Sequence, residues 1–431
     1  MMLVSGCARY GTRATKIREA FYSGDLPKAG TLAEEAAKKE RLAREMFKLD
    51  QAIISLTQGD AKGAEQKLRE VRDRFDENEG KGLGEKTGSY LTDDNAIAYE
   101  GEDYEKILVR AFLALSNLFQ DGGDTEAYCL QMIDKQNKII AAGADDKGEN
   151  PKKDYRLVAL APYLRGVLKE ATHRSYDDVE RSYVDVCSWQ PDFVNGPVDL
   201  ERAKLGVHSQ KGNGVLYVFT LVGKGPIKQP AVEEPSSEAL QAATVILGVT
   251  GDTTLPLMSA PVEVPLVMAQ PNRIGGIGVA VNGKPIGMTQ TITDVTRLAT
   301  EQYGAIYQKI VGRAVARRVV KRGINIATKR TVNNSDNFAT NLLFDATELL
   351  WESMEKADTR SWQLLPDKIQ VIRIELPADV HEITLDPAGY DGTVIGPSTT
   401  RRVLIEDGRN TYMLGNFPEP ELLGELLIRT P

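Results

Sequence analysis

Cys7 is the first residue in the sequence whose type and neighbours suggest chemistry, because it ends the stretch LVSGC at residues 3–7. This order is typical of a bacterial lipobox, in which the peptide bond before the cysteine is cleaved and the cysteine is lipidated. Only Met1 and Met2 precede the stretch, whereas an export signal needs a basic region and an apolar segment. Two interpretations stay open: a secreted lipoprotein whose signal lies upstream of this start, or a chance match in a cytosolic protein.

Other reactive residue types do not form a recognisable catalytic motif. His173, His208 and His381 lack metal-ligand spacing, and the sequence contains no H-E-x-x-H, C-x-x-C, P-loop or G-x-S-x-G motif. The glycine-rich stretch from Gly275 departs from the dinucleotide pattern and leads into a hairpin. We therefore predict no metal, no cofactor and no identified catalytic residue. A carboxylate pair for glycoside cleavage stays open, because spacing in sequence does not give separation in space.

Charge and cysteine content narrow the class of protein further. The net charge of −8 argues against general binding of nucleic acid. No apolar run approaches the roughly 18 residues of a membrane span, so we expect any membrane contact to be a tether. Cys129 and Cys187 lie in apolar helical surroundings, where two free thiols are the simpler interpretation and a disulfide is the alternative.

Five basic residues are concentrated in one predicted helix at residues 296–330. They could contact anionic lipid headgroups or a polyanionic wall polymer. The alternative, which we favour, is a solvated face that pairs with carboxylates of this acidic protein. The basic residues are Arg313, Arg317, Arg318, Lys321 and Arg322.

The elements that would position these residues begin with a helical part at residues 13–195, after a lipobox and tether at residues 1–12. A Gly-Asp pair followed by alanine recurs after 35 residues, at Gly24 and Gly59, close to the roughly 34 residues of a tetratricopeptide repeat. The spacing predicts about four stacked helical hairpins, with an unrelated helical bundle as the alternative. Stacked hairpins form a concave groove that suits peptides and helices. We expect exposed residues there to bind a partner: Arg44, Lys48, Gln51, Arg110 and Asn117.

The second part, residues 196–431, has the pattern of a mixed α+β domain. We predict strands within residues 214–290, two helices within 293–357 and further strands within 367–415. The β-branched stretch at residues 243–249 is among the predicted strands. Asn282-Gly283 predicts a tight hairpin turn. The predicted fold class is therefore α+β multidomain, with helical hairpins first and strands flanking two helices afterwards.

The stretch ADTRSW, at residues 357–362, follows the second of those helices. Asp358 is expected to bond backbone amides in a turn. Arg360 is expected to clamp a carboxylate, and Trp362 to seal the junction of sheet and helices. We predict a structural role for this motif, because neither a base nor a nucleophile lies beside it.

Four stretches together resemble a family of largely uncharacterised bacterial lipoproteins with a lipobox, tetratricopeptide-like helices and a C-terminal β-containing region. The stretches are LVSGC (3–7), YDDVERSY (176–183), GVLYVFTLVGKGP (214–226) and EKADTRSWQLLPDKIQVIRIELP (355–377). The resemblance implies a lipidated Cys7, and Ala8 after it favours the periplasmic face of the outer membrane. We predict a lipid-anchored scaffold that binds other envelope proteins. The alternatives are a cell-wall enzyme with an acidic site in the second domain, and a cytosolic adaptor if Met1 is the true start.

Overall fold

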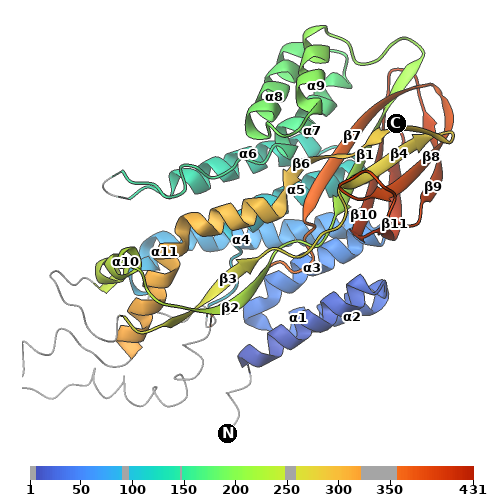
Figure 1. Cartoon of the computed structure of the whole chain (residues 1–431). Coiled ribbons are helices and arrows are strands. Elements are labelled where there is room, and N and C mark those ends of the chain that lie inside the picture. The colour runs from blue at the N-terminus through green and yellow to red at the C-terminus, as the bar shows by residue number, and fades with distance from the viewer. Residues whose placement is uncertain (1–5, 90–96, 146–147, 248–258, 322–356) are drawn as a thin grey trace, which may run out of the picture.

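A computed structural model describes residues 6–89, 97–145, 148–247, 259–321 and 357–431, with the side chains of 6–9, 80–89 and 320–321 excepted. Helices dominate the first half and sheets the second (Figure 1), so the predicted α+β multidomain fold class is confirmed. The predicted second helix of the α+β domain lies almost wholly outside the described residues. None of the described helices has the length and hydropathy needed to cross a bilayer.

The helical part is a series of helices in which each one contacts the next along the chain. It continues past residue 195, because one more helix packs on the fourth hairpin. The helices are α1 (Gly6–Tyr22), α2 (Leu26–Lys39), α3 (Arg44–Thr57), α4 (Ala61–Ser89), α5 (Asp103–Gln120), α6 (Thr125–Ala141), α7 (Leu160–Glu170), α8 (Tyr176–Trp189) and α9 (Asn195–Lys204), with a 3₁₀ turn η1 (Arg41–Ala43) before α3.

The first two helical turns share one construction, as the 35-residue repeat predicts. Gly24 and Gly59 adopt φ of +85° and +87°, which glycine reaches without steric cost. The carboxylates of Asp25 and Asp60 each accept a hydrogen bond from the amide three residues later, at 3.2 and 2.8 Å. The alanine four residues after each aspartate is fully buried. The small side chain there lets consecutive helices approach closely.

A five-stranded sheet in the order β11-β10-β1-β7-β6 forms the centre of the molecule. Its middle strand β1 runs parallel to β10 and antiparallel to β7, so it joins strands from both flanks of the chain. Val215, Tyr217 and Phe219 of β1 pack against the helices, while Leu216 and Val218 face the other side. The strands are β1 (Asn213–Val222), β6 (Gln290–Asp294), β7 (Lys368–Pro377), β10 (Asn410–Glu419) and β11 (Glu421–Arg429).

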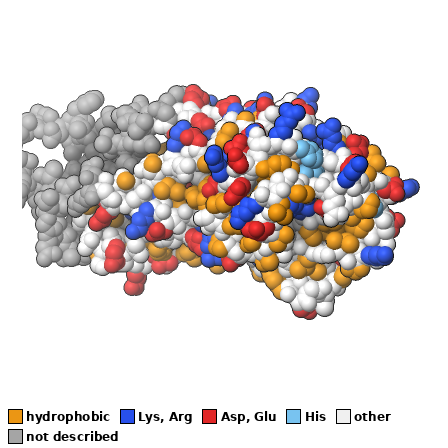
Figure 2. Space-filling model, turned by 90° about the horizontal axis from the view of Figure 1, so that it is seen from above, with side chains coloured by type: hydrophobic (Ala, Val, Ile, Leu, Met, Phe, Trp, Pro, Cys, Tyr) orange, Lys and Arg blue, Asp and Glu red, His pale blue; other side chains and the backbone are white. Residues whose placement is uncertain are grey.

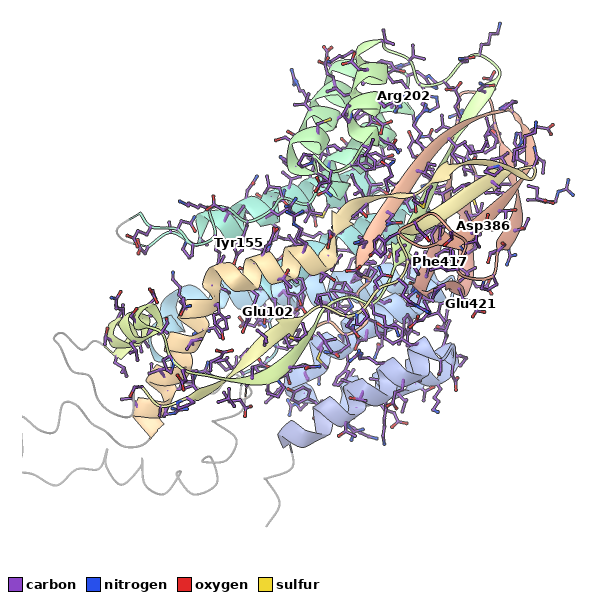
Figure 3. All side chains as sticks on the ribbon, in the orientation of Figure 1. Glu102, Tyr155, Arg202, Asp386, Phe417 and Glu421 are labelled. Carbon is purple, nitrogen blue, oxygen red and sulfur yellow. The ribbon has the colours of Figure 1, made fainter. Side chains whose placement is uncertain are left out.

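A four-stranded sheet in the order β5-β4-β8-β9 covers the other face of the central sheet. The two sheets enclose an apolar core that includes Phe417 of β10 (Figure 3). Asn282 and Gly283 both have positive φ between β4 and β5, so the predicted hairpin turn is confirmed. These strands are β4 (Gly276–Val281), β5 (Lys284–Met288), β8 (Asp379–Ala388) and β9 (Thr399–Ile405).

The remaining elements form an arm with its own small core at one end of the molecule (Figure 1). The predicted strand at residues 243–249 is wrong, because residues up to Leu247 belong to a helix. Ser236 accepts a hydrogen bond from the amide of Ala239 at the start of this helix, and its alanines pack closely on Gly312. The arm consists of β2 (Ile227–Glu233), β3 (Val262–Met268), α10 (Ser237–Leu247) and α11 (Val295–Lys321).

Candidate functional site

The ADTRSW motif lies in a segment, residues 357–367, that leads into β7 without regular secondary structure. Every residue from 360 to 367 is buried. A buried loop must find hydrogen-bond partners for its backbone away from water. Both ends of the segment bond to the strand-rich half of the chain, Ala357 to Glu263 and Leu365 to Gly225. Residues 359–364 bond to the helical part, and we call the surface of the helices that they contact the inner groove.

Two carboxylates of the inner groove bind the backbone of the segment. Glu105 of α5 accepts a hydrogen bond from the amide of Trp362 at 2.7 Å. Asp50 of α3 accepts hydrogen bonds from the amides of Gln363 and Leu364 through one oxygen, at 3.1 and 3.2 Å. Both carboxylates are fully buried. These contacts recognise the chain through its backbone, so they do not depend on the side chains it carries.

Arg360 is recognised through its side chain. Its guanidinium pairs with Asp358 through two hydrogen bonds of 2.9 and 2.8 Å. Its third nitrogen donates to the backbone oxygens of Leu42 and Ile97, both at 2.8 Å. The ring of Tyr99 lies 5.6 Å from the guanidinium carbon. Burial opposes ionisation of Asp358, but the hydrogen bonds and charge of Arg360 prevail and hold the pKa of Asp358 below its ordinary value.

Trp362 fills the inner groove next to α5. Its side chain has no exposed surface, and its ring centroid lies 5.4 Å from that of Phe112. Thr359, on the other side of Arg360, shares a 2.6 Å hydrogen bond with the hydroxyl of Tyr10 on α1. The segment therefore contacts α1, α3 and α5, the first helix of each of three successive hairpins.

The inner-groove carboxylates hold their protons more tightly than free side chains do. Burial, reinforced by the charge of Glu102, raises the pKa of Glu105. Burial also raises the pKa of Asp50 well above its ordinary value. The two hydrogen bonds that Asp50 accepts from backbone amides lower this pKa, but they offset the effect of burial only in part. Tyr99 and Tyr104 both donate hydroxyl hydrogen bonds to Glu105. The site thus offers hydrogen-bond acceptors in a dry setting, which suits recognition of a peptide.

The residues predicted to line a partner groove fall into two groups in the structure, one at least partly exposed and the other buried. Arg44 is exposed, Gln51 is half-buried, and Lys48 pairs with Glu70 at 2.8 Å. All three lie on α3, so the positions that can meet a partner from solvent belong to one helix.

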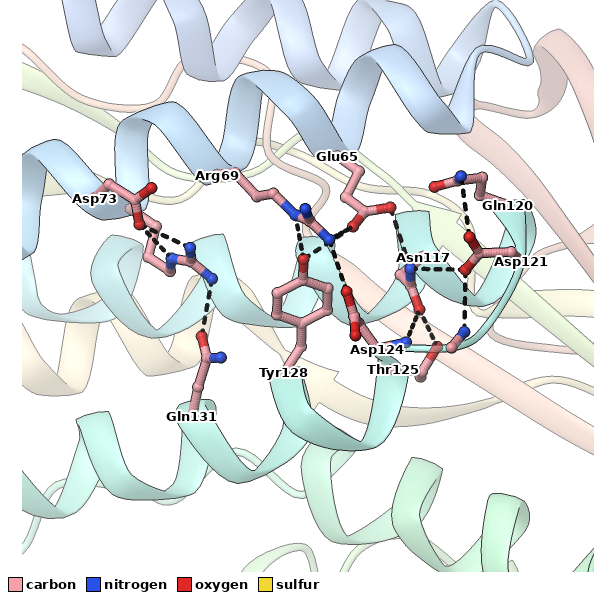
Figure 4. Close-up of polar contacts among 12 residues, drawn as sticks. Glu65, Arg69, Asp73, Asn117, Gln120, Asp121, Asp124, Thr125, Tyr128 and Gln131 are labelled. Atoms are coloured by element: carbon pink, nitrogen blue, oxygen red, sulfur yellow. Dashed lines mark hydrogen bonds and ion pairs between the residues drawn. The ribbon is translucent and has the colours of Figure 1, made fainter.

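The prediction that Arg110 and Asn117 are exposed is wrong, because only 4% and 2% of their surfaces are accessible. The cause is that α5 is an inner helix, packed between α4 and α6 and also touched by α11. The guanidinium of Arg110 binds both oxygens of Asp76 on α4, at 2.8 and 2.6 Å. Asn117 donates to Glu65 and accepts a hydrogen bond from Thr125, within a polar network between these helices (Figure 4).

The predicted basic face of α11 is turned partly inward. Arg313, Arg317 and Arg318 are half-buried. The guanidinium of Arg318 donates to the backbone oxygen of Ala260 at 2.7 Å and to that of Pro261, just before β3. These hydrogen bonds join α11 to the start of β3 within the arm. The side chain of Lys321 and all of Arg322 lie outside the described residues.

The three cysteines differ in what the structure says of them. Cys7 falls in the first turn of α1, and its side chain is among those not described. Cys129 is buried and Cys187 is half-buried, and both are free thiols. Burial raises the pKa of Cys129 to about 12, so this thiol stays protonated and unreactive.

Sequence reasoning did not predict a buried ionic cluster that lies between α7–α9 and the central sheet. Glu170, without exposed surface, accepts two hydrogen bonds from Arg202 (Figure 3) at 2.7 and 3.1 Å and one from the hydroxyl of Tyr183 at 3.0 Å. Asp199 also pairs with Arg202, at 2.6 Å. The one available signal is the polar Arg373 within the apolar run KIQVIRIELP, since its guanidinium donates to the backbone of His208 nearby. The paired charges fit a structural role.

No group of metal-binding side chains is found among the described residues. No protein-family model, no curated protein and no solved structure matches the chain. The resemblance to bacterial lipoproteins therefore stays a prediction from the sequence, and the contacts above carry the functional argument.

Proposed function

We propose that this protein is a lipid-anchored scaffold of the cell envelope that binds other proteins through its helical part. The observation that carries the proposal is the inner groove, where α3 and α5 bind the backbone of residues 362–364 and α1 contacts the side chain of Thr359. Stacks of helical hairpins commonly bind peptides on one of their surfaces. A cell-wall enzyme has less support, because the buried carboxylates of Glu170 and Asp199 are already paired with Arg202.

The position of α1 supports an anchor at Cys7. This helix lies at the outer edge of the helical part and packs on α2 (Figure 1). A lipid on its first turn can enter a membrane while the rest of the fold stays intact. One acyl chain binds a bilayer only weakly, so stable attachment requires the two or more chains of a mature bacterial lipoprotein. We place the protein at the outer membrane, facing the periplasm.

The anchor is tested by exporting the protein with an added signal sequence and labelling cells with a fatty-acid analogue. We expect label on the natural sequence but none on Cys7→Ala, which should leave the membrane fraction. Ser5→Ala is a matched control that changes a neighbouring residue and keeps the thiol. Equal labelling of natural protein and Cys7→Ala would overturn the anchor.

The scaffold function is tested with a photoreactive amino acid at Arg44 or Gln51 of α3. We expect discrete crosslinked envelope proteins at both positions. Gln241, exposed on α10 of the arm, is the control position and should give none of the same products. The same products at all three positions, or no product at either position on α3, would overturn binding through this helical surface.

A further inference from the structure

We propose that the inner groove is a binding site for peptides that carry an arginine two residues before a tryptophan, and that the chain fills this site in cis with residues 358–364. The inference rests on the proposed scaffold function and names the partner chemistry. A partner would present the same pattern on a segment of its own.

The chemistry of the inner groove selects a ligand rich in hydrogen-bond donors. The groups that receive hydrogen bonds from the segment are the carboxylates of Asp50 and Glu105 and the backbone oxygens of Leu42 and Ile97. A peptide backbone supplies amides to the carboxylates wherever it lacks proline. An acidic peptide would bring like charges to a buried acidic surface, which is costly.

The inner groove recognises the segment by side chain at two positions. Arg360 and Trp362 lie two residues apart, and both side chains contact the helical part of the molecule. Only a planar guanidinium can pair with Asp358 through two nitrogens and still donate a third to the carbonyls, so lysine does not substitute. The tryptophan pocket beside Phe112 demands a large aromatic ring.

The two intervening positions differ, because Thr359 is half-buried and Ser361 is fully buried. Thr359 contacts the hydroxyl of Tyr10, and the hydroxyl of Ser361 bonds within the segment, to the side chain of Gln363 at 2.9 Å. The half-buried position of Thr359 accepts varied residues, whereas the enclosed position of Ser361 requires a small one. The recognised pattern is therefore Asp, any residue, Arg, a small residue and Trp.

The cis segment competes with any partner because it is covalently attached. Attachment gives a high effective concentration, typically in the millimolar range for short flexible links. A partner peptide therefore binds weakly while the cis segment is intact. Substitutions that weaken the contacts of the cis segment should therefore free the site for a partner peptide.

The test uses the full chain with Arg360→Ala and Trp362→Ala together, and a fluorescent peptide of sequence KADTRSWQLL. We expect this variant to bind the peptide at least tenfold more tightly than the natural protein and to melt at a higher temperature with the peptide present. A control peptide with alanine in place of the arginine and tryptophan should do neither. Equal binding of both peptides, or no binding by a variant that stays folded by circular dichroism, would overturn the proposal.

If the double variant does not fold, Arg360→Lys replaces it, because it keeps the tryptophan anchor and removes only the forked hydrogen bonds. The same tenfold difference is then expected, and its absence contradicts the inference. Failure of this inference can be told apart from failure of the proposed scaffold function. Loss of peptide binding with crosslinks at Arg44 and Gln51 retained overturns the inference alone, whereas loss of those crosslinks with peptide binding retained overturns the scaffold and leaves a peptide site.

Discussion

The two faces of the central five-stranded sheet are built differently. The face toward the four-stranded sheet is an apolar core, to which β7 contributes Ile372 and Ile374. The face toward the helices carries apolar side chains too, but Tyr217 and its cross-strand neighbour Arg373 lie among them, and Trp362 of the motif segment joins the same core. Hydrophobic burial is non-directional, whereas a buried hydrogen-bonded charge fits only one arrangement. The comparison suggests that the apolar face supplies stability and the polar face fixes where the helices and the motif segment sit.

Both halves of the molecule expose hydrophobic side chains. Hydrophobic side chains gather over the end of the molecule where the sheets lie (Figure 2). Tyr390 and Val394, in the loop after β8, are largely exposed. The helical part exposes Val194 and Leu205 near its last helix. It also pairs surface charges along and between helices, as in Lys39–Glu35 and Lys48–Glu70.

The largest expected effect comes from removing the aromatic anchor of the motif segment. Trp362→Ala should destabilise the protein by about 3–5 kcal/mol, because it leaves a large cavity against Phe112. Urea unfolding followed by circular dichroism measures the change. A loss below about 1 kcal/mol would show that the segment is not held by this ring.

A slightly smaller loss is expected from breaking the buried ion pair. Arg360→Ala should cost about 3 kcal/mol, because it leaves Asp358 and two backbone oxygens without their partner. A double-mutant cycle with Asp358→Ala isolates the pair, and the second substitution should cost much less once the first is present. Additive losses would mean that the two residues act independently, against the geometry of the fork.

The buried carboxylate of Glu105 predicts a pH dependence. The folded protein binds its proton more tightly than the unfolded chain, so the contribution of this residue to stability falls as the pH rises from 4.5, its ordinary pKa, through the raised value. Glu105→Gln removes that titration. The free energy of unfolding of the variant should therefore improve relative to the natural protein as the pH rises, measured by urea unfolding at several pH values. A difference that stays constant across the range would contradict the raised pKa.

The apolar face should tolerate a small change. Ile372→Val, between the two sheets, should cost about 0.5–1.5 kcal/mol through loss of one methylene. The fold and peptide binding should be unaffected. A loss comparable to that of Trp362→Ala would show that the core between the two sheets also positions the chain. The proposed difference between the two faces would then be wrong.

The smallest effect is expected on the surface of α3. Lys48→Glu removes the exposed pair with Glu70 and should change stability by no more than about 0.5 kcal/mol. Thermal unfolding tests this, and Glu70→Lys in the same protein should restore the pair in reverse. A larger loss would show that this pair holds α3 and α4 together.

Local patterns in the sequence identified much of the architecture. The repeated Gly-Asp pair marks the first two helical turns, and Asn282-Gly283 marks a hairpin. The run at residues 243–249 misled, because β-branched residues favour a strand while the serine before the alanines starts a helix. Arg110 and Asn117 were placed on the surface because polar side chains at helical spacing do not reveal whether another helix covers them.

Local periodicity, with glycine, asparagine and aspartate at the turns, was enough to predict the helical hairpins, the strand-rich second half and several turns. The residue types of Asp358, Arg360 and Trp362 were enough to single them out as a motif. The position of this motif in the inner groove depends on packing between distant segments, since Asp50, Glu105 and Leu42 lie more than 250 residues away in sequence. Which polar residues are buried depends likewise on how the helices and the sheet pack, and no spacing within one segment records that.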